Sequence, residues 1–246
     1  MNAHVLDVIN AVQPWVSPHD QGNWEPWREG IVAACGILAE TALRYVPPCG
    51  TILDYGCGPL NKTAVLSKLG YRCTGYDLYL EGWHQDVFNK LRRFAHENSI
   101  DLNIGGELPD RPFDMVMSVD VLEHLPEPKR IFEQLVQRIA KSGILVTLVP
   151  NAGNIRKRLL LLSGGTNMPR FDEFWNYPPP FVGHVREYVR GDLKAMARYL
   201  GLEIVELRGV DCMMQKVPKA IRFPYLAGTA LFDSLKDTWL MVARKP

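Results

Sequence analysis

The sequence has almost no excess charge. Its 28 lysines and arginines balance 27 aspartates and glutamates, which leaves a formal net charge of +1 and an isoelectric point near 7.7. A chain with this balance creates no strong long-range field for a nucleic acid or an anionic membrane. We therefore expect no nucleic-acid partner, and any contact with an anionic surface has to be local.

Cysteine is scarce and follows no metal-binding pattern. The five cysteines are odd in number and never form a C-x-x-C pair: Cys35, Cys49, Cys57, Cys73 and Cys212. This spacing predicts neither a disulfide framework nor a zinc site, and it fits a reducing compartment. We expect no metal centre.

Long apolar segments are missing as well. No uninterrupted apolar run approaches the roughly 20 residues that a membrane span needs. The region before residue 30 includes Pro14, Asp20 and Glu25 and has no apolar stretch typical of a signal peptide. The sequence thus predicts a soluble, cytoplasmic protein without stable membrane association.

The chain does contain a regular alternation of strand and helix patterns, which starts near residue 50. Predicted strands occupy 51–55, 71–76, 100–104, 113–119 and 144–149, and predicted helices occupy 62–69, 86–97 and 128–141. Such alternation is typical of a Rossmann-like, doubly wound α/β fold, a mostly parallel sheet with helices on both faces. Two later strands, at 202–207 and 239–243, bring the sheet to about seven strands.

The length of the chain fits one large α/β domain with additions. Residues 1–48 precede the first strand and predict a helical cap, in which Ile31, Cys35 and Leu38 lie at helical spacing. Residues 49–246 follow as the main domain. Two irregular insertions interrupt it, at about 151–188 and about 211–233, and insertions of such length favour a lid or a binding segment.

Residues 51–60, TILDYGCGPL, form a short strand that runs into a glycine turn. Gly56 and Gly58 let the backbone approach a ligand or adopt a positive φ, and the helix behind the turn offers free N–H groups. Asn61 occupies the third glycine position of a dinucleotide fingerprint, which weakens the case for NAD. No Walker pattern precedes Lys62, so a P-loop for ATP is not expected.

Polar residues follow the predicted strands at their carboxyl ends. In a doubly wound sheet, ligands bind at these ends, near the point where the strand order reverses. We therefore expect one cleft to collect Asp54, Gly56, Asp77, Asp120 and Asn151. Asp77 ends the second strand, where a carboxylate can accept hydrogen bonds from ribose hydroxyls.

Four motifs carry a family resemblance. They occur in the order ILDYGCG at 52–58, FDMV at 113–116 with VLEHL at 121–125, KSGIL at 141–145 with VPN at 149–151, and GHVREY at 183–188. In these motifs the chain resembles class I S-adenosylmethionine-dependent methyltransferases of the small-molecule, type 11/12-like branch. The resemblance extends over residues 50–210. It implies an antiparallel last strand and S-adenosylmethionine as the cofactor.

The resemblance also implies a set of cofactor-binding residues. Asp77 would bind the ribose, and Asp54 would hold the turn and the cofactor's amino group. The complete set is Asp54, Gly56, Cys57, Gly58, Asp77, Leu78, Val119 and Asp120. For each acidic residue the alternative is a structural hydrogen bond at a cap or strand end. Leu60 replaces the third glycine that the family motif usually has, and we interpret it as a local change in turn geometry rather than lost binding.

Two histidines are candidate catalytic residues. A sulfonium methyl is already an activated electrophile, so such an enzyme mainly has to align the acceptor with it. A general base is needed only if the acceptor must lose a proton, as a hydroxyl must. His124 follows the fourth strand and His184 lies at the exit of the first insertion, and histidine suits proton transfer near neutral pH. The alternatives are structural: a helix-start residue for His124 and an insertion anchor for His184.

The predicted acceptor is a small organic molecule, methylated preferably on an oxygen. Nucleic-acid amino methyltransferases tend to carry an Asn-Pro-Pro-Tyr motif after the fourth strand, where this chain has SVDV at 118–121. Several aromatic residues either line a closable pocket or pack structurally: Trp15, Trp24, Trp27, Trp175, Tyr177 and Phe181.

Residues 156–162, RKRLLLL, are either an exposed helix start or a place of peripheral contact with a membrane surface or a phosphorylated or lipid-linked substrate. Two other functions remain open from the sequence. One is a methyltransferase-like binding or regulatory protein without turnover, and the other is a nicotinamide-dependent oxidoreductase. The sequence does not determine the oligomeric state.

Overall fold

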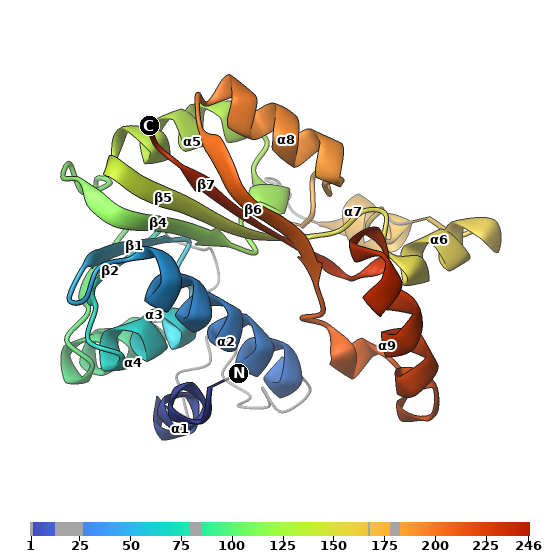
Figure 1. Ribbon diagram of the computed structural model, residues 1–246, viewed down its shortest axis with the longest axis horizontal. Helices are drawn as coiled ribbons and strands as arrows, with labels where there is room; N and C mark the ends of the chain where they lie inside the picture. Colours follow the sequence, from blue (N-terminus) through green and yellow to red (C-terminus); the bar gives the residue numbers. More distant parts are fainter. Residues whose placement is uncertain (1, 13–26, 79–84, 167, 178–182) are drawn as a thin grey trace.

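The alternating segments fold into one seven-stranded sheet (Figure 1). Its strands are β1 (Thr51–Tyr55), β2 (Arg72–Asp77), β3 (Asp101–Ile104), β4 (Phe113–Val119), β5 (Ile139–Pro150), β6 (Glu203–Val210) and β7 (Thr238–Arg244). They lie in the order β3-β2-β1-β4-β5-β7-β6. Only β7 runs antiparallel to its two neighbours among these strands. The predicted fold class is confirmed, and the strand order reverses between β1 and β4.

The structure, a computed structural model, describes residues 2–12, 27–78, 85–166, 168–177 and 183–246. Helices cover both faces of the sheet (Figure 1): α1 (Ala3–Val12), α2 (Arg28–Tyr45), α3 (Asn61–Lys68) and α4 (Gln85–Glu97) lie on one face, and α5 (Pro128–Gln137) and α8 (Arg190–Tyr199) lie on the other. Trp15 and Trp24 of the predicted cap fall outside the described residues. The division into cap and main domain remains a prediction.

Helix α2 packs against the sheet, as the spacing of its apolar residues predicts. Ala34, Leu38 and Ala42 join one core cluster with residues of β1, β4, β5 and β7. Leu38 is fully buried, whereas Leu43 on the same helix is 52% exposed. Because the helix places residues three and four apart on one side, the buried stripe faces the sheet.

The predicted helix at 128–141 is four residues too long. Helix α5 ends at Gln137, and Arg138 closes it by donating to the carbonyl oxygens of Pro109 and Gln134. Ile139 already pairs with Phe113 on β4, and a bulge follows before regular pairing resumes. Strand pairing therefore overrides the helical spacing of apolar residues, and β5 begins five residues before the predicted start.

Both insertions contain helices, and the sequence anticipates one of them as the exposed helix start at 156–162. The first forms α6 (Ile155–Leu162) and α7 (Phe171–Asn176), and the second forms α9 (Arg222–Leu231). All three extend from the same end of the molecule, where β5 leads into α6 (Figure 1). Within the described part of the chain, the helices are too short or too polar to cross a membrane.

We predict that Leu38→Ala lowers the free energy of unfolding by about 3 kcal/mol, because a buried leucine loses its contacts and leaves a cavity. Leu43→Ala, on the same helix but exposed, should change it by less than about 0.5 kcal/mol. Urea denaturation of both variants tests this. Equal effects would contradict the packing of α2.

Candidate active site

The turn between β1 and α3 is held against the end of β2. The main-chain N–H groups of Gly56 and Cys57 both donate to the carbonyl oxygen of Tyr76, at 2.8 and 3.1 Å. Gly56 has φ of 75° and Gly58 has φ of 49°, so both adopt the left-handed conformation that glycine favours. A Cβ on Gly56 would come within 2.3 Å of Val121, whereas a Cβ on Gly58 would meet no atom of the described residues within 4 Å. The turn is therefore tightly packed at Gly56 and open at Gly58.

Leu60 keeps a left-handed backbone in place of the usual glycine. Its φ is 63° and its side chain is fully buried, which costs about 1–2 kcal/mol of backbone strain for an L-residue. Gly75 on β2 makes the room, since a Cβ there would come within 2.7 Å of the Leu60 side chain. The turn thus retains a backbone conformation that glycine would adopt easily, and no altered turn geometry is needed to explain this residue.

Two buried carboxyl groups lie at the ends of β1 and β2. Asp54 accepts a hydrogen bond from Thr63 at 2.6 Å through Oδ2, while its buried Oδ1 has no hydrogen-bond partner among the described residues. Asp77 accepts the Gly58 N–H at 2.7 Å. Burial raises the pKa of each carboxyl to about 6. Both carboxyl groups also make hydrogen bonds within the protein, so a purely structural role at the strand ends stays open for each of them.

Lys62 is a site residue that the sequence analysis did not single out. It follows the turn in the first part of α3, and its Nζ lies 3.9 Å from Oδ2 of Asp120, just beyond β4. Burial lowers the pKa of Lys62, but the charges of Asp120 and Asp54 outweigh it and leave the pKa raised. The sequence placed Lys62 in the first turn of the helix behind the glycines but gave no signal that its side chain points toward Asp120.

The two candidate histidines meet in one cluster. Their rings lie edge to face with centroids 4.8 Å apart. His184 Nδ1 lies 3.1 Å from Oε1 of Glu187, and its Nε2 lies 3.9 Å from Oε1 of Glu123. Lys157 of α6 also bonds to Glu187. Motifs that are 60 residues apart in the chain, VLEHL and GHVREY, are thus in contact.

Glu123 is the buried acid of this cluster. Burial, reinforced by the charge of Asp120, raises its pKa to about 8, so the carboxyl holds a proton at neutral pH. Its carbonyl oxygen accepts the N–H groups of Val185 at 2.7 Å and Arg186 at 3.2 Å. In contrast, hydrogen bonds from His184 and Lys157 outweigh burial at Glu187 and hold its pKa below the usual range. One acid near His184 is therefore neutral and the other is ionised.

Glu123, His124 and His184 could also hold a metal ion, since one ligand atom from each lies within 4.8 Å of the others. Imidazole and carboxylate ligands suit several divalent cations. The prediction of no metal centre stays a prediction.

Three further predicted residues differ in their surroundings. Asn151 follows β5 directly, and its side-chain N–H group donates to the carbonyl oxygens of Ser234 and Lys236. The amide therefore holds the chain before β7, and its convergence on the cleft stays a prediction. Val119 lies in the core, and Leu78 is 52% exposed next to a segment outside the described residues.

The remaining predicted residues are Cys57 of the turn and the aromatic residues of the first insertion. Cys57 is buried, and burial holds the pKa of its thiol well above the usual range, so it serves packing rather than reactivity. Trp175 and Tyr177 are exposed, and Phe181 falls outside the described residues. The predicted aromatic pocket stays a prediction.

Residues 27–207 match a family model described as a methyltransferase domain. The chain belongs to this methyltransferase domain family. The match begins at α2 and ends within β6, so it includes the glycine turn, both strand-end carboxyl groups and the histidine cluster of this methyltransferase domain. The family resemblance of the four motifs is confirmed.

Two curated methyltransferases are similar to the chain. A ubiquinone biosynthesis O-methyltransferase of Hydrogenovibrio crunogenus is 25% identical over 65% of this chain and 65% of the relative. A 2-methyl-6-phytyl-1,4-hydroquinone methyltransferase of Synechocystis is 28% identical over 55% of this chain and 43% of the relative. The alignments thus span less than two thirds of either relative.

Solved structures share the fold of this methyltransferase domain protein. A magnesium protoporphyrin IX methyltransferase of Synechocystis, crystallised with bound SAH, superposes with a TM-score of 0.59 at 12% identity, covering 100% of this chain and 96% of that one. The PH0226 protein of Pyrococcus horikoshii superposes with the same TM-score at 16% identity, covering 94% and 95%. At these identities the likeness concerns the fold alone.

The left-handed backbone at position 60 predicts that glycine is preferred over alanine there, the inverse of the preference within a helix. Leu60→Gly and Leu60→Ala should both destabilise the protein by about 2 kcal/mol or more, because a buried side chain is lost. Leu60→Gly should nevertheless be the more stable by about 1 kcal/mol, since only glycine relieves the left-handed strain. Urea denaturation measures the difference.

The helical position Leu66 supplies the control. Leu66 is equally buried but lies within α3. Leu66→Ala should therefore be more stable than Leu66→Gly by about 1 kcal/mol, because alanine favours a helix over glycine. If alanine is preferred at both positions, the strain at Leu60 is refuted.

Proposed function

We propose that this protein is an S-adenosylmethionine-dependent methyltransferase that transfers the methyl group to a small organic acceptor, preferably to a hydroxyl oxygen. The observation that carries the proposal is the contact between the Gly58 N–H and the Asp77 carboxylate at the mouth of the glycine turn. Membership of the methyltransferase domain family supports the reaction class. The printed name of one relative, an O-methyltransferase, supports oxygen as the acceptor atom.

The strand-end residues fit the donor. Asp77 has a second carboxylate oxygen with which it can accept a ribose hydroxyl, and the space beside Gly58 is free for a ligand. The buried Oδ1 of Asp54, without a partner among the described residues, fits a polar group that the fold itself does not supply. When bound, S-adenosylmethionine supplies a methyl group on a sulfonium, which is already activated for transfer.

Asp120 and Val119 would bound the methyl end of the donor site through the chain that leaves β4. Asp120 has a left-handed backbone with φ of 55°, which turns the chain sharply at the strand end. Its carboxylate faces Lys62, so its negative charge is already partly balanced. We therefore assign Asp120 a positioning role toward Lys62, with the sulfonium as a second, weaker partner.

His184 is the candidate general base, and Glu187 orients it. With Nδ1–H donated to the Glu187 carboxylate, the imidazole presents Nε2 as a proton acceptor, which is the arrangement that histidine bases use. The acceptor's O–H proton would pass to Nε2 as its oxygen forms a bond to the methyl carbon and the carbon–sulfur bond breaks. The His184 side chain is 38% exposed, so the proton can leave to solvent. His124, packed against the His184 ring, would restrict its orientation.

One experiment distinguishes the proposed methyltransferase from a regulatory binding protein and from a nicotinamide-dependent oxidoreductase. Purified protein is incubated with methyl-labelled S-adenosylmethionine and pooled hydroxyl-containing small molecules, and labelled products are separated by chromatography. Transfer to a hydroxyl supports the proposal. Donor binding without transfer to any pool would favour the regulatory alternative. Absence of donor binding, with NADH bound instead, would favour the oxidoreductase, which family membership already argues against.

We predict that His184→Ala lowers kcat for a hydroxyl acceptor by about 10²–10⁴-fold, the usual contribution of a general base. Donor affinity should change by less than about twofold, because His184 does not contact the glycine turn in this account. Calorimetry and a kinetic assay measure the two quantities. His96→Ala, at an exposed histidine of α4, should leave both unchanged, and an unchanged kcat in His184→Ala would remove the base role.

We also predict that the donor binds more tightly as pH rises through about 6, the range in which Asp77 loses its proton. Ribose hydroxyls bind better to the ionised carboxylate, because hydrogen bonds to charged groups are stronger. Asp77→Asn should weaken binding above this pH by about 10–100-fold and make the profile shallower, leaving the part that Asp54, whose pKa is also about 6, contributes. Asp110→Asn, at a fully exposed carboxylate, is the matched control. A steep profile in Asp77→Asn would assign the effect to another group.

A further inference from the structure

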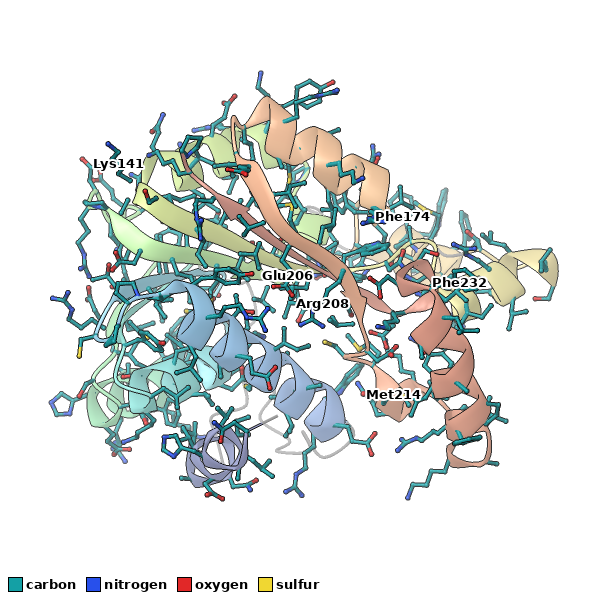
Figure 2. All side chains as sticks on the ribbon, in the orientation of Figure 1. Lys141, Phe174, Glu206, Arg208, Met214 and Phe232 are labelled. Carbon is teal, nitrogen blue, oxygen red and sulfur yellow. The ribbon has the colours of Figure 1, made fainter. Side chains whose placement is uncertain are left out.

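Exposed apolar side chains gather on the two insertions. Fifteen of the 21 large apolar side chains that are exposed in the described residues lie there. One of them, Val185, lies next to His184. The other fourteen are Leu159, Leu160, Leu161, Leu162, Met168, Phe171, Phe174, Trp175 and Tyr177 in the first insertion and Ile221, Phe223, Leu226, Leu231 and Phe232 in the second. We call these fourteen side chains the insertion surface. Figure 2 shows Phe174 and Phe232 at the same end of the molecule.

The leucines of α6 cannot all face the protein. Successive residues of a helix are about 100° apart, so four in a row point to all sides. Leu159–Leu162 are each at least 44% exposed, Leu162 reaches 84%, and no residue of α6 is buried. The end of α6 therefore protrudes with apolar side chains around its whole circumference, which is costly in water and favourable in an apolar medium.

Helix α9 turns its apolar stripe outward. Phe223, Leu226 and Leu231 fall within an arc of about 140° around the helix and are 83%, 45% and 75% exposed. The protein-facing side is polar: Thr229 is buried, and the Tyr225 hydroxyl donates to Asp211 at 3.0 Å. In an ordinary surface helix the apolar stripe faces the core. In α9 the apolar side chains face outward instead, which indicates that they contact a surface other than this chain.

The short helix α7 adds aromatic side chains. Phe171 and Trp175 stack with ring centroids 5.4 Å apart and are 68% and 71% exposed. Large aromatic side chains are favoured at the boundary between water and lipid, where amphipathic segments insert only shallowly.

Basic residues flank this surface. Arg156, Lys157 and Arg158 precede the leucines of α6, and residues 212–232 contain three basic and no acidic residues. Lys157 bonds to Glu187 and Arg222 to Glu29, so part of the charge is balanced. Burial lowers the pKa of Lys216, and the charges of Arg156 and Lys157 lower it further. Positive charges from both insertions thus lie close enough to repel one another, and an anionic surface would relieve this.

We propose that the insertion surface docks reversibly on an anionic lipid bilayer, with its apolar side chains in the interfacial layer and the basic residues at the headgroups. A second copy of the chain is the less suitable occupant, because a twofold interface would bring like basic flanks together. The chain of contacts from Lys157 through Glu187 to His184 connects α6 to the candidate base. If the proposed function holds, docking brings the bilayer to the insertion that contacts the orienting partner of the candidate base.

The full chain is mixed with vesicles of phosphatidylcholine alone or with added phosphatidylglycerol, and the bound fraction is measured by sedimentation. We expect binding to the anionic vesicles that weakens with salt, since part of the attraction is electrostatic. Leu161→Glu combined with Leu231→Glu should lower the apparent partition coefficient by at least about tenfold, because two inserted leucines are lost. Leu43→Glu, whose leucine is 52% exposed on α2 against 50% for Leu161, should leave it unchanged.

Several outcomes would overturn the proposal. These are no sedimentation with either kind of vesicle, an equal loss in Leu43→Glu, or a dimer of the original chain that the double variant converts to a monomer. Binding of S-adenosylmethionine to the same variants is measured separately by calorimetry. Vesicle binding without donor binding would support membrane docking and reject the proposed function. Donor binding without vesicle binding would reject membrane docking and leave the proposed function standing.

Discussion

The structure depends most on the left-handed turn that joins β1 to α3. Its two N–H groups bond to the Tyr76 carbonyl oxygen and a third bonds to Asp77, so the carboxyl ends of β1 and β2 are fixed relative to each other. A Cβ at Gly56 would collide with Val121, which ties the same turn to the chain leaving β4. Three strand ends are thereby held around one point, and the side chains at those ends are positioned before any ligand binds. Such preorganisation lowers the cost of binding.

Around the histidine cluster, the charge states of the two neighbouring acids depend on burial and on hydrogen bonds. Glu123 remains protonated because it is enclosed, whereas Glu187 remains ionised because Lys157 and His184 bond to it. The difference between the two acids gives His184 one neutral and one charged neighbour. Since Lys157 comes from α6, the insertion takes part in setting the charge state beside the candidate base. The insertion surface and the histidine cluster are therefore parts of one structural unit.

Local pattern was sufficient to predict much of the fold. Strand β4 has the predicted bounds, and the turn, Asp54 and Asp77 lie where the motif places them. What failed depended on long-range contacts. The early start of β5 arises from pairing with Phe113, and the engagement of the Asn151 amide arises from chain more than 80 residues away. The exposed helix start expected at 156–162 is observed as α6. Helices α7 and α9 were missed because their apolar residues face outward, so the usual relation between periodicity and a core does not hold.

The most direct test is a crystal structure of the full chain with S-adenosylhomocysteine, the product of the donor. The account predicts that the ligand lies along the turn from Gly56 to Gly58, that its ribose hydroxyls bond to the Asp77 carboxylate, and that its sulfur faces the side of the site on which His184 lies. A ligand bound elsewhere, or a ribose that does not contact Asp77, would contradict it.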